Sequence, residues 1–172
     1  MSFDPFPERI DAYQLFVGNS SINSEIPLSR FKRLKDYLSH DKGLVQVELN
    51  FNRDENQYRR VSGRISTKVQ VLCQRCLQET SLELSPDVNV LVVSDDAEAQ
   101  AMLLECESVQ ADDKGLDLLA LVEDELILSL PIVAYHAENC RSDVNNGDDR
   151  KSNSDIFPGK AKVFDVLRNL KK

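Results

Sequence analysis

The chain has 172 residues, of which 41% are apolar and 29% charged, and its net charge is −8. This length suits one domain with a core, with or without tails, and no apolar run is long enough to span a membrane. Residues 1–80 carry 12 Lys and Arg against 10 Asp and Glu, whereas residues 81–172 carry 9 against 19. Because the acidic second half repels phosphate, the composition argues against independent, tight binding of nucleic acid, and any RNA contact is expected in the first half.

The N-terminus does not show a basic region followed by an apolar one, so we expect no signal peptide and a cytoplasmic location. The chain contains four cysteines. In a cytoplasmic protein these residues favour free thiols or a metal site over disulfides.

The first forty residues predict one strand and one helix. Residues 13–17 are expected to pair as a strand, and residues 19–21 have the composition of a turn. Residues 27–39 predict a helix, because Phe31, Leu34 and Leu38 recur at helical spacing with basic residues on the other face. That basic face is most simply solvated, although it is also a candidate surface for RNA.

The middle of the chain predicts an antiparallel sheet. Residues 45–51 and 61–71 alternate apolar and polar side chains, which is typical of half-buried strands. Residues 82–92 predict a third and a fourth strand, interrupted at Pro86. The Cys-Gln-Arg-Cys sequence at 73–76 is expected to form a turn between the second and third strands.

A helix beginning at Asp117 is the clearest element of the sequence. Asp117 is expected to cap it, Leu118, Val122 and Leu126 form an apolar stripe, and Pro131 ends it. The residues of the acidic run 123–125 are interpreted as solvated, as are the acidic pairs at 95–96 and 112–113. A further short helix is expected over residues 97–104.

The domain organisation follows from these elements. Residues 1–142 are expected to form a single α+β domain, an antiparallel sheet meander covered by one long helix. Residues 143–156 are rich in Asp, Asn and Ser and predict a mobile acidic linker. Residues 157–172 regain apolar helical spacing and predict an amphipathic tail helix that docks on the body or on a partner.

Two short motifs carry the candidate chemistry. Cys73 and Cys76 have the spacing of half a tetrahedral metal site, and His136 and Cys140 offer a second half. Three sulfurs and one nitrogen suit a structural zinc ion, provided that the fold closes the 59 residues between Cys76 and His136. The alternative is a set of reduced thiols and an unrelated histidine. A redox-active pair is disfavoured, because the cysteines lie between strands and not at the start of a helix.

Motifs of common enzymes are absent from the sequence, which has no Gly-rich phosphate loop, no Gly-x-Ser-x-Gly and no His-Glu-x-x-His. With two histidines in the chain, candidates for acid-base catalysis are few. We therefore expect a protein that is not an enzyme.

Four features together carry a resemblance to a known family: residues 71–77, the Leu-rich acidic helix with its final proline at 116–131, the pair His136 and Cys140, and the apolar residues of 164–170. In these features the chain resembles the bacterial YceD-like family. This family comprises the large ribosomal RNA subunit accumulation proteins. Its members often carry a Gly-Leu-Cys-Pro-x-Cys-Gly segment that this chain lacks, and His136 and Cys140 stand where those members have cysteines.

The resemblance implies a non-enzymatic accessory factor in the synthesis, processing or stability of 23S ribosomal RNA. The expected partner is a pre-ribosomal particle or a ribosome-associated protein, with RNA contacted indirectly or through the N-terminal half, where the basic face of 27–39 and Arg75 are candidates. The alternatives are an interaction adaptor without a ribosomal role and a metal-dependent nuclease.

Overall fold

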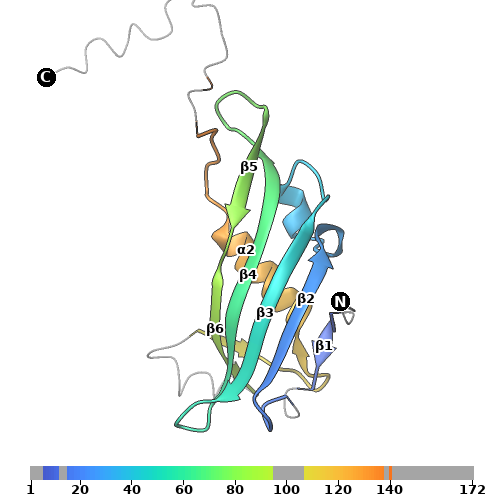
Figure 1. Ribbon diagram of the computed structural model, residues 1–172, viewed down its shortest axis with the longest axis vertical. Helices are drawn as coiled ribbons and strands as arrows, with labels where there is room; N and C mark the ends of the chain where they lie inside the picture. Colours follow the sequence, from blue (N-terminus) through green and yellow to red (C-terminus); the bar gives the residue numbers. More distant parts are fainter. Residues whose placement is uncertain (1–5, 12–14, 95–106, 138–139, 141–172) are drawn as a thin grey trace, which may run out of the picture. The chain divides into compact units, whose positions relative to one another are not determined.

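A computed structural model describes residues 6–11, 15–94, 107–137 and 140, which belong to one compact unit ending at Cys140. Its core is a six-stranded sheet in the order β2-β3-β4-β6-β7, with β5 paired to β4 off this path (Figure 1). The strands are β2 (Ser20–Pro27), β3 (Leu44–Arg53), β4 (Arg59–Leu72), β5 (Glu79–Leu84), β6 (Asp87–Val93) and β7 (Ser108–Gln110). A separate two-stranded sheet joins β1 (Arg9–Ile10) to β8 (Leu116–Asp117).

The long strand β4 organises the sheet. Its N-terminal part pairs with β6 and its C-terminal part with β5, so these two strands lie one after the other along the same edge of β4. They are separated at Pro86, whose carbonyl accepts a hydrogen bond from Ile65 N at 3.0 Å. All these pairings are antiparallel, and β7 alone among the described strands of this sheet runs parallel to its neighbour. The predicted α+β class with a mainly antiparallel sheet is therefore confirmed.

The alternating residues of β3 explain why it forms. Val45, Val47, Leu49 and Phe51 are fully buried, while the residues between them lie outside the core. In the neighbouring strand β4, Gly63 lies so close to β3 that a Cβ atom there would come 1.9 Å from the carbonyl oxygen of Glu48. Only glycine, which has no Cβ atom, fits between the two strands at this position.

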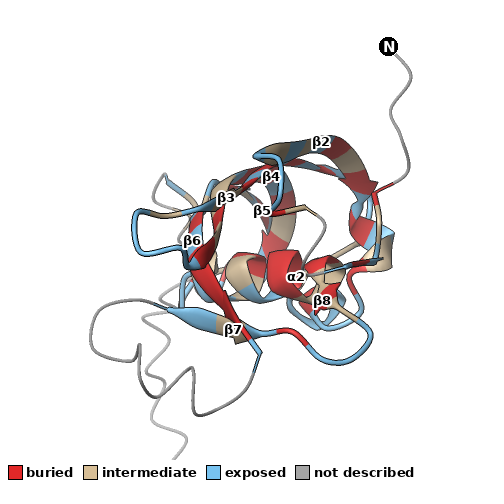
Figure 2. Cartoon of the chain, turned by 90° about the horizontal axis from the view of Figure 1, so that it is seen from below, coloured by how far each residue is buried: buried red, intermediate tan, exposed pale blue. Residues whose placement is uncertain are grey.

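The predicted helix is α2 (Leu118–Ser129), which has three turns. Ala120 N donates a hydrogen bond to the carboxylate of Asp117, the capping contact expected from the sequence. Leu118, Val122 and Leu126 are fully buried in the same hydrophobic cluster as the strands. In Figure 2 the buried residues of α2 and of the sheet face one another.

The N-terminal predictions were partly wrong. Residues 15–19 form a turn, which contains Asn19 of the predicted turn, and residues 12–14 lie outside the described part. The strand of this region is β2, which begins at Ser20, within the predicted turn. Alternation in β2 is hard to recognise because a serine, Ser24, occupies one of its buried positions.

The predicted helix over 27–39 is two short 3-10 helices, η1 (Leu28–Arg30) and η2 (Leu34–Tyr37). Phe31 and Leu34 are fully buried, so the apolar stripe is used as expected. A continuous helix is interrupted because the backbone amides of Arg33 and Leu34 donate to the carboxylate of Glu123, at 2.7 and 3.1 Å, and not to carbonyls of a preceding turn.

Three predictions fall outside the described residues: the short helix over 97–104, the linker over 143–156 and the tail helix over 157–172. They stay predictions. In the described residues, no helix combines the length and apolar character needed to cross a membrane.

Candidate metal centre

The turn between β4 and β5 holds the first two thiols. Cys73 N donates to the carbonyl of Gln78 at 2.8 Å, and Leu77 N donates to the carbonyl of Cys73 at 2.8 Å. Leu77 adopts a left-handed conformation with φ 59°, which allows the chain to reverse directly after Cys76. We name residues 73–78 the knuckle, and its two closing hydrogen bonds hold both thiols in one turn.

The segment after α2, which begins at Pro131, supplies the other two side chains, His136 and Cys140. Pro131 follows the helix, and the carbonyl of Ala134 then accepts a hydrogen bond from Gln74 N at 2.9 Å. This contact fastens the segment to the knuckle immediately before His136. Figure 1 shows the orange segment rising from α2 beside the green hairpin of β4 and β5.

The four predicted residues are brought together. The sulfur atoms of Cys73, Cys76 and Cys140 and a ring nitrogen of His136 all lie within 4.8 Å of one another. Cys73 Sγ is 3.4 Å from Cys140 Sγ, and Cys76 Sγ is 3.4 Å from His136 Nδ1. Tetrahedral zinc with ordinary bond lengths separates two sulfurs by about 3.8 Å and a sulfur and a nitrogen by about 3.6 Å. The arrangement is therefore close enough to hold a metal ion with only small adjustments.

The ring of His136 is oriented by the protein. Its Nε2 lies 3.0 Å from the carbonyl oxygen of Glu79. A carbonyl only accepts hydrogen bonds, so Nε2 carries a proton, and in the neutral imidazole Nδ1 is then the nitrogen with a lone pair for a metal. Backbone carbonyls that fix the tautomer in this way are a regular feature of histidines that ligate metals.

The electrostatics of the cluster favour a thiolate at Cys73. Burial opposes ionisation of this thiol, but hydrogen bonds from the backbone amides of Cys76, Arg75 and His136 and from the Cys140 side chain outweigh it and lower the pKa of Cys73 to about 5. At Cys140, burial and the neighbouring thiols raise the pKa instead. The amides thus favour one anionic ligand before any metal binds. A bound cation would offset both the burial and the neighbouring thiols that raise the pKa of Cys140.

Comparison with known proteins identifies the family of the chain. Residues 61–171 match the family described as large ribosomal RNA subunit accumulation protein YceD, a match that includes all four clustered residues. The chain belongs to the YceD family. A curated relative from Haemophilus influenzae, named large ribosomal RNA subunit accumulation protein YceD, is 29% identical over 145 residues, covering 81% of this chain and 78% of the relative. No solved structure matches the chain.

In this YceD-family chain the basic stretch after β2 is largely paired. Arg33 Nε lies 2.9 Å from Glu123 and Arg33 Nη1 lies 2.6 Å from Asp124. Lys35 pairs with Asp41 at 2.7 Å. The interpretation of Glu123 as a solvated residue was wrong, because only 7% of it is exposed and its Oε1 accepts hydrogen bonds from the backbone amides of Arg33 and Leu34.

Arg75, the other candidate for contacting RNA, lies over the ring of Tyr135 at 5.0 Å from its centroid. This cation–π contact is a second tie between the knuckle and the segment after α2. The sequence analysis identified the four clustered side chains but not the backbone contacts of Ala134 and Glu79. Every residue has a carbonyl group, so residue type does not reveal which carbonyls make contacts.

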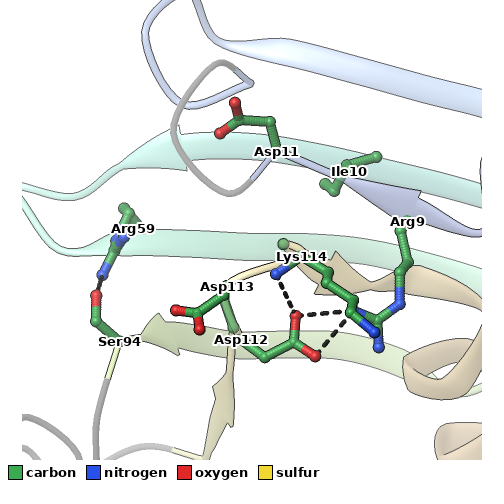
Figure 3. A pocket seen from close by; sticks show the side chains of 10 residues that line it. Arg9, Ile10, Asp11, Arg59, Ser94, Asp112, Asp113 and Lys114 are labelled. Atoms are coloured by element: carbon green, nitrogen blue, oxygen red, sulfur yellow. Dashed lines mark hydrogen bonds and ion pairs between the residues drawn. The ribbon is translucent and has the colours of Figure 1, made fainter.

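The structure also contains a polar cavity of about 460 Å³ beside β1. Figure 3 shows Arg9 donating to both carboxylate oxygens of Asp112, at 2.7 and 2.9 Å, and Arg59 donating to Ser94. Asp112, expected to be merely solvated, is therefore ion-paired, and its hydrogen bond with Arg9 holds the pKa of this carboxyl below its usual range. The lining residues are Arg9, Ile10, Asp11, Arg59, Ser94, Ala111, Asp112, Asp113, Lys114 and Gly115.

Charges in this cavity balance, since three basic and three acidic residues line it. No histidine or cysteine is among the described residues that line it. The acidic pair at 95–96 lies outside the described residues.

Proposed function

We propose that this protein is a non-enzymatic accessory factor in the synthesis, processing or stability of 23S ribosomal RNA, acting in the cytoplasm on large-subunit precursors. The observation that carries the proposal is membership of the YceD family, whose description concerns accumulation of the large ribosomal RNA subunit. The relative from Haemophilus influenzae bears the same description in its name.

The charge distribution supports a protein partner or a pre-ribosomal particle over naked RNA. The chain carries a net charge of −8. Three arginine and lysine residues near η1 and η2 already have carboxylate partners: Arg30, Arg33 and Lys35. A phosphate backbone would have to displace those carboxylates, whereas a basic protein would be attracted to the acidic surface.

The four clustered residues would hold a structural zinc ion. Three thiolates and one imidazole complete a tetrahedron, so no position remains open for a water nucleophile or a substrate. Such an ion would fasten the segment after α2 to the knuckle. A closed ligand set supports a role in stability and does not support a metal-dependent nuclease, which needs an exchangeable site.

The metal proposal is tested by elemental analysis of the full chain purified without chelator. We expect one zinc per chain, loss of that zinc in Cys73→Ser and Cys140→Ser, and its retention in Cys106→Ser, which leaves all four ligands in place. Zinc content that is unaffected by Cys73→Ser would refute the ligand assignment.

The cellular role is tested by deleting the gene and measuring 23S relative to 16S ribosomal RNA. We expect less 23S RNA and fewer large subunits, restored by the wild-type chain, and co-sedimentation of the protein with large-subunit precursors on a sucrose gradient. An unchanged RNA ratio, with all the protein at the top of the gradient, would favour an adaptor without a ribosomal role. RNA cleavage by purified protein with added divalent metal would favour a nuclease.

A further inference from the structure

A groove of about 300 Å³ lies where η2, the end of β4 and the segment after α2 meet. Three of the side chains that line it are large, apolar and exposed: Tyr37 at 58%, Leu72 at 54% and Ile132 at 98%. We name this feature the knuckle groove. Contiguous apolar surface of this kind, rimmed by polar groups, is typical of a place where another molecule binds.

Exposed apolar residues gather at this end of the molecule. Of the ten large ones in the described part of the chain, six belong to η2, to the end of β4 with the knuckle, or to the segment after α2, although these segments are short. The six are Tyr37, Leu72, Leu77, Ile132, Val133 and Tyr135. Three of these six line the knuckle groove, and the other three belong to the same short segments. A scatter of single apolar residues would need no explanation, but a concentration in three short segments does.

The groove is held open by contacts described above. One wall is fixed because Gln74 N donates to the carbonyl of Ala134, and both residues line the groove. The opposite wall is η2, whose first buried residue, Leu34, donates its amide to Glu123. A surface that is already shaped before binding loses little conformational entropy when a partner arrives.

Charge identifies the kind of partner. Asp36 is the one charged side chain among the described residues that line the groove, and no lysine or arginine lines it. The protein as a whole is also acidic, with a net charge of −8. The complementary ligand therefore has apolar side chains for the groove and a lysine or arginine for Asp36.

We propose that the knuckle groove is the docking site for a basic polypeptide segment with apolar anchor residues, carried by a protein of the large ribosomal subunit. The inference deepens the proposed function and rests on it. Ile132 and Leu72 supply the apolar contact and Asp36 supplies the electrostatic contact. A metal ion at the four clustered residues would fasten the knuckle to the segment after α2, which together form one wall of the groove.

The contact is tested by photo-crosslinking from a benzophenone amino acid placed at position 132 of the full chain. The probe is a mixture of the purified proteins of the large ribosomal subunit. We expect crosslinks from position 132 to one segment that contains apolar residues next to lysine or arginine. The same label at Val17, which is 82% exposed in a turn that does not line the groove, should give few or none.

Binding of the crosslinked segment, made as a synthetic peptide, then separates apolar from electrostatic contributions. Ile132→Lys adds a repelling charge and should weaken binding about 30-fold or more, as expected for a central contact residue. Ile132→Glu loses the same apolar contact but keeps an attractive charge, so it should weaken binding less. Asp36→Asn should weaken binding several-fold and reduce its dependence on salt, whereas Val17→Lys should leave it unchanged.

Several results would overturn this assignment. Crosslinks from position 132 to RNA, to a second copy of the chain or to its own residues 157–172 would each assign the groove to a different occupant. Equal crosslinking from positions 132 and 17, or none, would show that the groove is not a docking site. If deletion of the gene still lowers 23S RNA, the proposed function survives such a result, and only the docking proposal fails.

Discussion

Replacing Glu123 with alanine should lower the free energy of unfolding by about 2–4 kcal/mol, a value built up from its individual contacts. The carboxylate accepts hydrogen bonds from the backbone amides of Arg33 and Leu34 and from Arg33 Nε. Leu34 is fully buried, so its amide would be left without water or another acceptor, at a cost of about 1–3 kcal/mol. Arg33 is half exposed, and the loss of its ion pair should add less than about 1 kcal/mol.

The neighbouring residue Asp124 provides a matched control. It also pairs with Arg33, but both side chains are half exposed, so Asp124→Ala should cost at most about 1 kcal/mol. Glu123→Gln keeps one acceptor oxygen and should fall between the two alanine variants. The assay is urea unfolding followed by circular dichroism at neutral pH with metal present. Equal losses for Glu123→Ala and Asp124→Ala would refute the reasoning that burial of the carboxylate sets its contribution.

Three further predictions concern the sheet and the metal centre. Gly63→Ala should destabilise the fold by about 1–3 kcal/mol or more, because its Cβ would meet the backbone of Glu48, whereas Gly18→Ala, with nothing within 4 Å, should be nearly neutral in the same unfolding assay. The pKa of Cys73 is about 5 in the folded state, below the ordinary thiol value of about 8.5, so the thiolate stabilises the fold at alkaline pH and this contribution is lost as pH falls toward 5. In metal-free protein, the stability advantage of wild type over Cys73→Ser should accordingly shrink between those two pH values, and a constant difference would contradict the assignment. Removing the metal with a chelator should accelerate hydrogen exchange at the Gln74 amide, which donates to Ala134, and leave β3 protected; equal acceleration in β3 would point to global unfolding instead.

Sequence reasoning succeeded where the signal is local. The capped apolar stripe of α2 and the strict alternation in β3 are encoded within single segments, so both elements could be predicted. The two halves of the cysteine and histidine cluster were also recognisable from spacing within short motifs. Whether the two halves come together could be stated only as a condition. It depends on the backbone hydrogen bond between Gln74 and Ala134, which residue type does not reveal.

It failed where distant contacts decide the local structure. The apolar spacing of residues 27–39 predicted one helix, but Glu123, some ninety residues further on, takes up the amides of Arg33 and Leu34 and divides the segment. The same charged residue was interpreted as solvated because acidic runs on helices usually are. Neither error could be removed without knowing that η2 and α2 are neighbours.

The distance along the chain between the two halves of the metal cluster has a consequence for how the protein is made. A bound ion would close a loop of roughly 60 residues, a constraint on the unfolded chain equivalent to about 4 kcal/mol in the chain-entropy estimate for cross-links. Cys73 and Cys76 leave the ribosome long before His136 and Cys140, so a growing polypeptide can complete the tetrahedron only after β5, β6 and α2 have been synthesised. Metal capture would therefore be a late event in biosynthesis, one that marks a finished domain and does not initiate its folding.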